Sequence, residues 1–220
     1  MEPIAPRTDL AYRAAKRLLD LLVASIALVL LSPLFVVVAV AIKLTSPGPI
    51  LFRGIVHGRN GKPFTYYKFR SMAAGGDTSQ HREFIRAYVA DGKGQQDAKT
   101  GEEVFKLTND PRVTPFGRFI RRFSIDEFPQ MLNVLKGDMS LVGPRPPVPY
   151  EYELYDQRKK LRLLVKPGIT GLNQIRARGQ SSFEQMYQDD LDYIRNQSLW
   201  LDLAILFKTP WVMLFRAGKT

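Results

Sequence analysis

Two adjacent carboxylates stand in an otherwise basic stretch of the chain. Asp126 and Glu127 follow residues 117–122, a basic run that holds three arginines. Carboxylates beside several fixed cations suit a site that handles phosphate, because the cations neutralise phosphate oxygens and carboxylate oxygens are ligands that Mg²⁺ accepts. The pair therefore marks a candidate site for phosphate chemistry.

The same residues also fit a helix start. Ser124 and Glu127 have the Ser-x-x-Glu spacing of a capping box ahead of an apolar run, and acidic residues in a first turn complement the helix dipole. Pro129 weakens this interpretation, because it has no N–H to donate to Ile125 and is best tolerated in a first turn. We therefore expect the helix to begin near Phe128 and both carboxylates to lie in the turn that enters it.

The composition favours an anionic partner and excludes thiol chemistry. The chain has 220 residues, with 32 Lys and Arg against 21 Asp and Glu. This basic balance favours nucleic acid, anionic lipid or a phosphorylated substrate. The absence of Cys excludes disulfides, thiol catalysis and Cys-ligated zinc. The two histidines, His57 and His81, come from unrelated sequence contexts, and no dinucleotide-binding or Walker-type glycine loop is present.

The apolar run over residues 21–42 has the length of a membrane-spanning helix. As a helix it would reach roughly 33 Å, about one bilayer core. Pro33 lies at its centre, where it loses an N–H and opposes the carbonyl of Val29 at a cost on the order of 3 kcal/mol, and Ser32 can satisfy a freed backbone group. Both flanks are basic, whereas a spanning helix is normally asymmetric in Lys and Arg. From the residues alone, a kinked spanning helix and a re-entrant hairpin both remain open.

A β-hairpin is expected after this run. Asn60-Gly61 is a strong turn dipeptide between two strand-like segments. On the second strand Tyr66, Lys68 and Arg70 share one face, because side chains alternate along a strand. The two cations are either a solvated face or a grip on phosphate.

Arg145 is the third candidate cation. The sequence Pro144-Arg145-Pro146 leaves its backbone few conformations. The segment is either a stiff connector or a rigid loop that clamps an anion with little loss of entropy.

The remaining segments predict helices and a loop. Thr114-Pro115 is expected to cap a short basic helix, and residues 78–89 to form another helix. Ser181 and Glu184 form a capping box for an amphipathic helix over 181–196. The apolar segment 199–215 is either an interfacial or a buried helix. Polar residues 91–103 read as a mobile loop that serves as a lid or a connection.

Together these motifs resemble those of the monotopic phosphoglycosyl transferases, the bacterial sugar transferase family that begins polysaccharide and glycan assembly on polyprenol phosphate. The resemblance covers about residues 16–215, in the small, catalytic-core form. The order and spacing of its motifs make it specific. These motifs are Ser32-Pro33 and residues 67–72, 124–130, 133–146 and 166–171.

The resemblance implies an α/β mixed, mostly helical fold in three parts. Residues 1–12 would be a tail, 13–45 a re-entrant membrane helix broken at Ser32-Pro33, and 46–220 a catalytic domain. A small β-hairpin and interfacial amphipathic helices would surround its compact core. The resemblance favours the hairpin over the spanning helix, at the cytoplasmic face of the bacterial inner membrane.

The activity implied is transfer of a sugar 1-phosphate from a UDP-sugar to polyprenol (undecaprenyl) phosphate, with release of UMP. This would be the first membrane step of exopolysaccharide, capsule, O-antigen or glycoprotein glycan assembly. The implied partners are the UDP-sugar donor, the polyprenol phosphate acceptor and membrane lipid, with no nucleic acid, and a homodimer is compatible with them.

The resemblance also implies roles for individual residues. Asp126 would be the nucleophile on the sugar-bearing phosphate and would form a phosphosugar-enzyme intermediate. Glu127 would help the second step, and Mg²⁺ would be held near Asp126. The expected phosphate clamp consists of Lys68, Arg70, Arg118 and Arg145.

Two departures and two alternatives remain. Phe128 and residues 172–174 differ from the usual pattern of the family, and the segment 73–105 exceeds its minimal core. The main alternative function is a membrane-tethered basic nucleic-acid-binding module, although Asp126 and Glu127 would repel phosphates there. The other alternative is a non-enzymatic membrane scaffold in which the acidic turn is only a cap.

Overall fold

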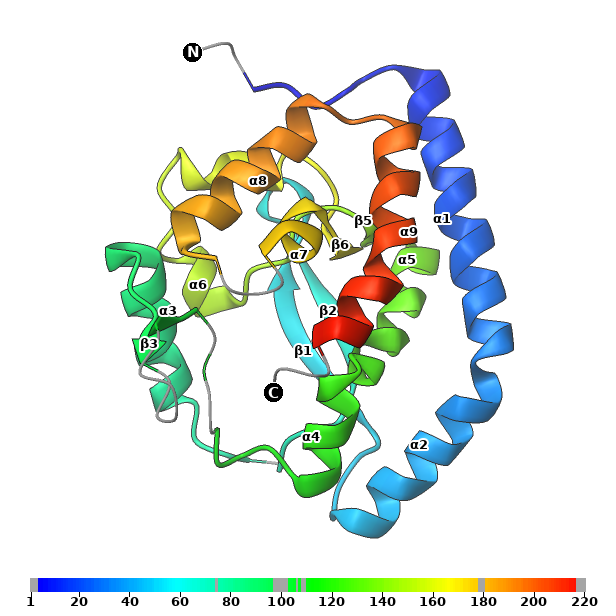
Figure 1. The fold of residues 1–220 in the computed structure, drawn as a ribbon, viewed down its shortest axis with the longest axis vertical. Coiled ribbons are helices and arrows are strands. Elements are labelled where there is room, and N and C mark those ends of the chain that lie inside the picture. The colour runs from blue at the N-terminus through cyan, green and yellow to red at the C-terminus, as the bar shows by residue number, and fades with distance from the viewer. Residues whose placement is uncertain are drawn as a thin grey trace.

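Helices form most of the molecule, and an antiparallel β-hairpin lies behind them in the view of Figure 1. The computed structural model describes residues 4–73, 75–96, 103–105, 107, 110–177 and 181–216. The expected α/β mixed, mostly helical fold is confirmed. The longer helices are α1 (Leu10–Leu30), α2 (Ser32–Thr45), α3 (Ser79–Asp91), α4 (Pro115–Arg122), α8 (Phe183–Arg195) and α9 (Leu199–Arg216).

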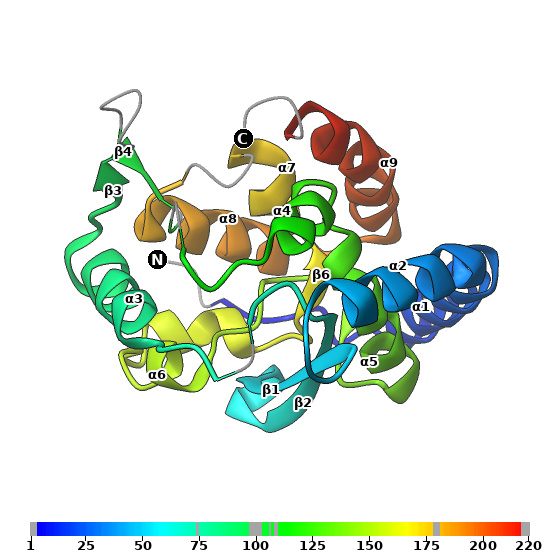
Figure 2. The ribbon, with the colours of Figure 1, turned by 90° about the horizontal axis from the view of Figure 1, so that it is seen from below.

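Short helices and strands fill the space between these helices. The short helices are η1 (Arg59–Gly61), η2 (Ile125–Gln130), α5 (Met131–Lys136), α6 (Pro149–Tyr152), η3 (Lys159–Leu163) and α7 (Leu172–Ala177). The antiparallel strand pairs are β1 (Leu51–His57) with β2 (Pro63–Phe69), and β3 (Gln95–Gln96) with β4 (Glu103–Val104). The strands β5 (Ser140–Val142) and β6 (Gly168–Thr170) pair in parallel. Seen from below, α3 lies at the opposite end of the molecule from α1 and α2 (Figure 2).

The break at Ser32-Pro33 is present where the sequence predicts it. The helices α1 and α2 meet there at a bend of 60°. The Ser32 hydroxyl donates to the carbonyl of Val29 at 2.8 Å, the carbonyl that Pro33 leaves without its N–H partner. Of the helices described, none alone is long and apolar enough to cross a bilayer, whereas the bent pair passes that test together. The re-entrant hairpin over 13–45 stays a prediction, and the helix itself begins earlier, at Leu10.

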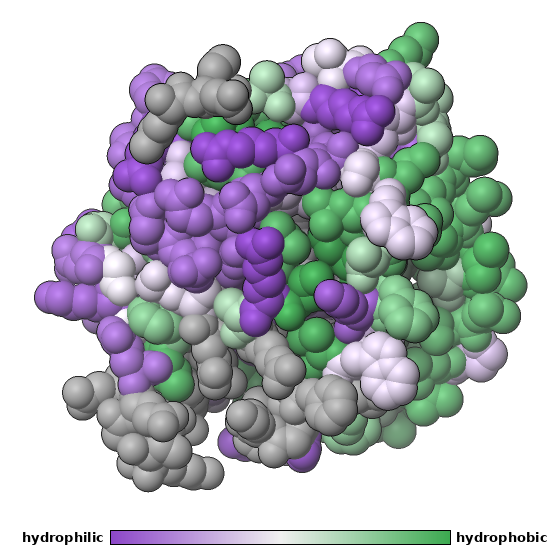
Figure 3. Space-filling view, turned by 45° about the horizontal axis from the view of Figure 1, so that its top comes forward, coloured by the Kyte–Doolittle hydropathy of each residue, from purple (hydrophilic) through white to green (hydrophobic). Residues whose placement is uncertain are grey.

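The bent pair and α9 expose apolar side chains. Figure 3 shows a broad hydrophobic region on the side of the molecule that α1 and α2 occupy. The α9 helix is two-sided, because Asp202 and Ile205 are fully buried while its tryptophans are exposed. An amphipathic α9 with an apolar outer face fits an interfacial helix. The large exposed apolar residues of these helices are Leu10, Leu18, Leu22, Ile26, Val29, Leu30, Val36, Val37, Val40, Leu44, Trp200, Leu203, Phe207 and Trp211.

Buried polar contacts fix α1 to the rest of the protein. The carboxylate of Asp202 accepts hydrogen bonds from the hydroxyls of Tyr12 and Tyr193 at 3.2 and 2.7 Å, and it pairs with the Lys16 ammonium at 3.0 Å. Asp20 of α1 accepts from the Ser140 hydroxyl at 3.0 Å and from the N–H of Leu141 at 2.9 Å. The helix is therefore tied to α8, α9 and β5.

Replacing Asp202 by Asn is expected to lower the free energy of unfolding by about 3 kcal/mol, because the Lys16 ammonium, only 15% exposed, loses its fully buried carboxylate partner. Urea titration of the purified variant measures this loss. Asp192→Asn is the matched control. The Asp192 side chain is 44% exposed and pairs with Arg176, so its removal should cost under about 1 kcal/mol. Equal losses in the two variants would contradict the role given to Asp202.

The hairpin of β1 and β2 has the predicted turn. Asn60 and Gly61 both adopt positive φ, 59° and 72°, which the Asn-Gly dipeptide tolerates. The strands then pair from His57↔Pro63 to Leu51↔Phe69.

Other sequence predictions need correction. The cap of α8 is Ser182, whose hydroxyl accepts from the N–H of Gln185, while the Ser181 hydroxyl accepts from Asn173 instead. Two residues of the predicted loop 91–103 form β3, and its last residue belongs to β4. Residues 97–102 of that loop lie outside the described part of the chain. The parallel pair β5–β6 was not predicted.

Candidate active site

The two carboxylates lie on a 3₁₀ turn at the start of α5. Ser124 precedes this turn with a φ of 53° and makes no side-chain capping hydrogen bond. The α-helix begins at Met131, so the predicted start near Phe128 was three residues too early. A 3₁₀ turn accommodates Pro129 because its bonds run from i to i+3 in a short segment that the helix does not continue. Asp126 and Glu127 do lie in the turn that enters the helix, as expected.

The strand β2 lies against this turn and brings Lys68 to it. Asn133 of α5 is fully buried and joins the two elements: its oxygen accepts from the N–H of Tyr67 at 3.2 Å, and its amide donates to the carbonyl of Thr65 at 2.6 Å. With the strand fixed in this register, the Lys68 ammonium pairs with the Glu127 carboxylate at 2.9 Å. The same ammonium lies 5.1 Å from the centre of the Tyr66 ring.

Asp126 is the buried member of the pair, with 6% of its surface exposed. The pKa of this carboxyl is raised to about 6, mainly by burial; the Lys68 charge opposes the rise, Glu127 adds to it, and Arg121 also opposes it. The pKa of Lys68 is raised, because Glu127, Tyr66 and Asp126 outweigh the opposing effect of its own burial. At neutral pH the site therefore holds an ionised but poorly solvated carboxylate beside a fixed ammonium.

Arg145 and Arg121 complete the positive surroundings. The charges that act on Lys68 include that of Arg145, and those that act on Asp126 include that of Arg121. The Arg145 loop is held from behind by Arg162, which is 1% exposed, donates to the carbonyl of Arg145 at 3.1 Å and pairs with Asp190 at 2.7 Å. The rigid presentation of Arg145 predicted from its two prolines agrees with this arrangement.

Two predicted phosphate ligands lie elsewhere. Arg118 is exposed on α4, and no contact described for it joins it to Asp126. Arg70 is 5% exposed, and one nitrogen donates to the carbonyl and hydroxyl oxygens of Ser46, both at 2.7 Å, where α2 ends. Its Nε and Nη1 have no hydrogen-bond partner in the described structure. A phosphate-binding role for either arginine stays a prediction.

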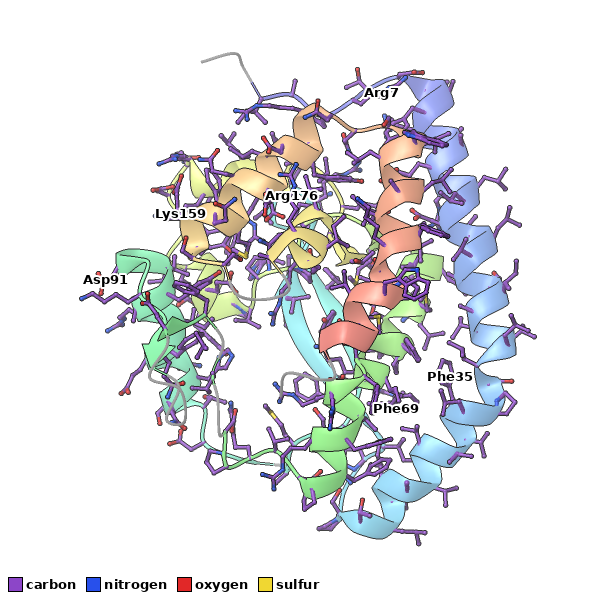
Figure 4. The ribbon with its side chains drawn as sticks, viewed as in Figure 1. Arg7, Phe35, Phe69, Asp91, Lys159 and Arg176 are labelled. Atoms are coloured by element: carbon purple, nitrogen blue, oxygen red, sulfur yellow. The ribbon has the colours of Figure 1, made fainter. Side chains whose placement is uncertain are left out.

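Aromatic rings connect the bent helix pair α1–α2 to the turn that carries Asp126 and Glu127. The ring centres of Phe35 (α2) and Phe69 (β2) lie 5.6 Å apart in an edge-to-face arrangement, and the two side chains point toward each other in Figure 4. The ring centre of Phe35 also lies 6.2 Å from that of Phe128, the residue after Glu127. The apolar helix pair and the carboxylates therefore belong to one packed unit.

Sequence reasoning missed three residues of this region. Arg121 lies in the basic run 117–122 before the carboxylates, and no local pattern distinguishes it from the other two arginines of that run. His81 of α3 shares a hydrogen bond of 2.6 Å with the Tyr150 hydroxyl. Burial, with Arg145 and Arg112 nearby, lowers the pKa of His81 to about 4, so it is neutral at pH 7. No local sequence signal joined His81 to Tyr150, because 69 positions separate them.

The donor set at the carboxylates fits Mg²⁺ better than a transition metal. No cluster of three or more His, Cys, Asp or Glu that could hold a metal occurs in the described residues. Mg²⁺ is often held by one or two carboxylates together with substrate phosphates and water, so it does not need such a cluster. Asp126, buried and close to a second carboxylate, can supply the protein ligand.

Comparison with known proteins identifies the family. Residues 11–216 match the family described as Bacterial sugar transferase. This chain belongs to that family. The exopolysaccharide production protein ExoY of Rhizobium meliloti is 43% identical to it over 206 residues, which are 93% of this chain and 88% of ExoY.

Two longer relatives carry names that state a reaction. The undecaprenyl-phosphate galactose phosphotransferase of Salmonella typhimurium is 41% identical over 215 residues, 96% of this chain but 44% of that protein. The UDP-glucose:undecaprenyl-phosphate glucose-1-phosphate transferase of Escherichia coli is 40% identical over 219 residues, 94% of this chain and 42% of that protein. This chain thus spans less than half the length of these two relatives and most of ExoY.

Proposed function

We propose that this member of the family transfers a sugar 1-phosphate from a UDP-sugar to undecaprenyl phosphate and releases UMP. The observation that carries the proposal is the buried Asp126 carboxylate beside Glu127, Lys68 and the positive charges of Arg121 and Arg145. The names of the relatives from Salmonella and E. coli supply the donor and acceptor classes. The step belongs to the assembly of an exopolysaccharide or related surface glycan, as the name of ExoY supports.

In the first half-reaction Asp126 attacks the phosphorus that bears the sugar. A new bond forms between a carboxylate oxygen and that phosphorus, and the bond from the phosphorus to the bridging oxygen breaks. UMP leaves with the electron pair. A carboxylate and a diphosphate repel each other, and Lys68 with the nearby arginines lowers that repulsion and stabilises charge that develops on the phosphate oxygens.

In the second half-reaction the phosphate of the lipid acceptor attacks the same phosphorus. The acyl phosphate bond to Asp126 breaks, and the products are polyprenyl diphosphate sugar and a free carboxylate. Glu127 is 35% exposed and adjacent to Asp126, so it can orient the incoming lipid phosphate or accept its remaining proton. Mg²⁺, when bound by Asp126 and the donor phosphates, would neutralise the diphosphate charge.

The packing of α1 and α2 against the catalytic turn also supports a position for the protein on the membrane. The apolar faces of α1 and α2 would dip into the cytoplasmic leaflet, and the contact between Phe35 and Phe128 would then bring the catalytic turn to the bilayer surface. A soluble nucleotide-sugar could meet there a lipid whose phosphate stays at the interface. Family membership favours this function over the nucleic-acid module and the scaffold considered from sequence.

Intact-protein mass spectrometry tests the proposal. The protein is incubated with Mg²⁺ and a panel of UDP-sugars without lipid acceptor, and a mass increase equal to one sugar phosphate is expected with the correct donor. The donor that gives the adduct also names the sugar. If no donor gives an adduct, and no UMP is released when undecaprenyl phosphate is added, the transferase proposal fails for these donors.

The rate of adduct formation is expected to depend on pH with a midpoint near 6. Burial raises the pKa of Asp126 to about 6, and only the ionised carboxylate is a nucleophile. The rate should therefore fall about tenfold for each pH unit below 6 and level off above it. Single-turnover kinetics between pH 5 and pH 8 measure this profile. Because Mg²⁺ bound to the carboxylate would lower this midpoint, the pKa of Asp126 is also followed without Mg²⁺ by carboxyl ¹³C NMR. A midpoint near 4 there, the value of an exposed Asp, would contradict the buried environment described for Asp126.

A further inference from the structure

Arg17 and Lys166 meet at the end of α5 that lies away from the catalytic turn, and the charge of Arg59 acts on Lys166. Arg17 of α1 is fixed at the end of this helix, because its two terminal nitrogens donate to the carbonyls of Val134 and Leu135 at 2.6 and 2.8 Å. Lys166 lies between β5 and β6 in sequence, and Arg59 lies on η1. The cluster thus combines side chains from three parts of the chain that are far apart in sequence.

Gly137 marks the point where two of these cations meet. It follows α5 with a φ of 89°, a conformation that favours glycine. A Cβ at this residue would stand 3.5 Å from the Lys166 ammonium and 3.6 Å from an Arg17 guanidinium nitrogen. The two charged groups are therefore at most 7.1 Å apart, the sum of those distances. That span allows one phosphate group to contact both.

Lys166 is half-buried among like charges without a counter-ion. Within the part of the chain that the structure describes, neither Lys166 nor Arg59 has a carboxylate at ion-pair distance. Burial lowers the pKa of Lys166, and the charges of Arg17 and Arg59 lower it further, while Asp20 and Asp138 act in the opposite direction. Neither acid forms an ion pair with Lys166 in the described part of the chain: Asp20 accepts hydrogen bonds from Ser140 and Leu141, and Asp138 lies 3.4 Å from the Asn133 amide.

The position of the cluster indicates which anion it receives. Arg17 directly precedes Leu18, and from Leu18 exposed apolar side chains continue along α1 to the bend. If α1 and α2 dip into a leaflet, as proposed above, Arg17 stands at the depth of the lipid phosphates. A basic group at that depth attracts anionic headgroups, at about 1 kcal/mol for each cation.

We propose that Arg17, Lys166 and Arg59 form a phosphate-binding site, separate from the catalytic carboxylates, that holds the headgroup of an anionic phospholipid. The inference rests on the proposed seating of α1 and α2 in the membrane. Bound there, the headgroup neutralises Lys166 and connects α1, the end of α5 and the turn before β6 at the bilayer surface.

Vesicle flotation tests this site. Wild-type protein is mixed with vesicles of phosphatidylcholine, or of equimolar phosphatidylcholine and phosphatidylglycerol, and the partition coefficients are compared. The wild type should prefer the anionic vesicles, and Lys166→Gln should reduce that preference about fivefold, the equivalent of about 1 kcal/mol. Lys166→Arg, which keeps the charge, should restore it.

Arg86→Gln is the charge-matched control. Arg86 is exposed on α3, at the opposite end of the molecule from α1 in both ribbon views. Its removal should change the preference for anionic vesicles by less than twofold, because exposed charges beyond a Debye length are screened. Equal losses in Lys166→Gln and Arg86→Gln would overturn the site and leave only a diffuse attraction.

A second arm separates lipid from soluble phosphate. Thermal unfolding of both proteins is followed with inorganic phosphate at constant ionic strength. Stabilisation of the wild type but not of Lys166→Gln, with unchanged vesicle preference, would overturn the lipid assignment. A wild type that binds no vesicles would overturn the membrane seating and this site together, whereas the donor adduct on Asp126 tests the transferase chemistry independently.

Discussion

Replacing Asp126 by Asn is expected to abolish the donor adduct and to lower turnover by at least about 10⁴-fold, because the amide cannot attack phosphorus. The same variant should be more stable than the wild type at pH 8. Since burial raises the folded-state pKa to about 6 from 3.8, the Asp126 contribution to stability is present below about pH 4 and lost as the pH rises through 6. A neutral amide removes that loss, which is about 2–3 kcal/mol for a shift of this size.

The stability result separates catalysis from capping. If Asp126 only stabilised a helix start, Asp126→Asn would leave stability nearly unchanged, because Asn caps a helix as well as Asp does, and would leave function intact. Urea titration at pH 8 and the adduct assay therefore distinguish the two interpretations. A nucleophile predicts a more stable variant without adduct, and a cap predicts a variant that still forms the adduct. A variant that is less stable than the wild type and still forms the adduct would contradict the nucleophile assignment.

Glu127→Gln is the matched control for this experiment. It changes the neighbouring carboxylate on the same turn, and the proposal gives that group a role in the second half-reaction. The variant should still form the adduct and release UMP in the absence of acceptor, while transfer to undecaprenyl phosphate slows. Loss of the adduct in both variants would show that the two carboxylates are not divided between the half-reactions.

Local chemistry made the break between α1 and α2 and the hairpin turn predictable. Ser32-Pro33 and Asn60-Gly61 act through their own backbones, so the bend of 60° and the two positive φ angles follow from a few neighbouring atoms. The start of α5 was misplaced because Ser124 adopts a left-handed conformation, for which the sequence Ser-Ile-Asp gives no signal. The cap at Ser182 was missed because two adjacent serines are equally good candidates.

Contacts between segments that are far apart in the chain could not be predicted from the sequence. Asp202 is an acidic residue within the apolar segment 199–215, and its sequence context does not show that it anchors α1 through Tyr12, Lys16 and Tyr193. The parallel pairing of β5 with β6 joins two three-residue strands, too short for a periodic pattern. Lys68 was predicted to bind phosphate from its position on a strand, but its partner Glu127 became visible only when β2 and η2 were brought together.

Replacing Lys68 by Met is expected to slow adduct formation about 10²–10³-fold, the usual effect of removing one positioned charge from a transition-state site. The pH midpoint should also move upward from about 6. Burial raises the pKa of Asp126 and Lys68 opposes that rise, so its removal leaves the carboxyl harder to ionise. Single-turnover rates across the pH range report both changes.

Lys136→Met, on α5 beside the β2 strand, is the control of equal charge change. The Lys136 ammonium donates to the Tyr67 hydroxyl at 2.7 Å and is exposed, on the strand face opposite to Lys68. It should leave the midpoint in place and reduce the rate by no more than a few-fold, because a screened surface charge has little effect on a buried carboxyl. If Lys68→Met slows the reaction without moving the midpoint, Lys68 only holds Glu127 in position. A shifted midpoint would show that Lys68 acts electrostatically on Asp126, and that the basic residues of this turn allow a buried carboxylate to approach a diphosphate.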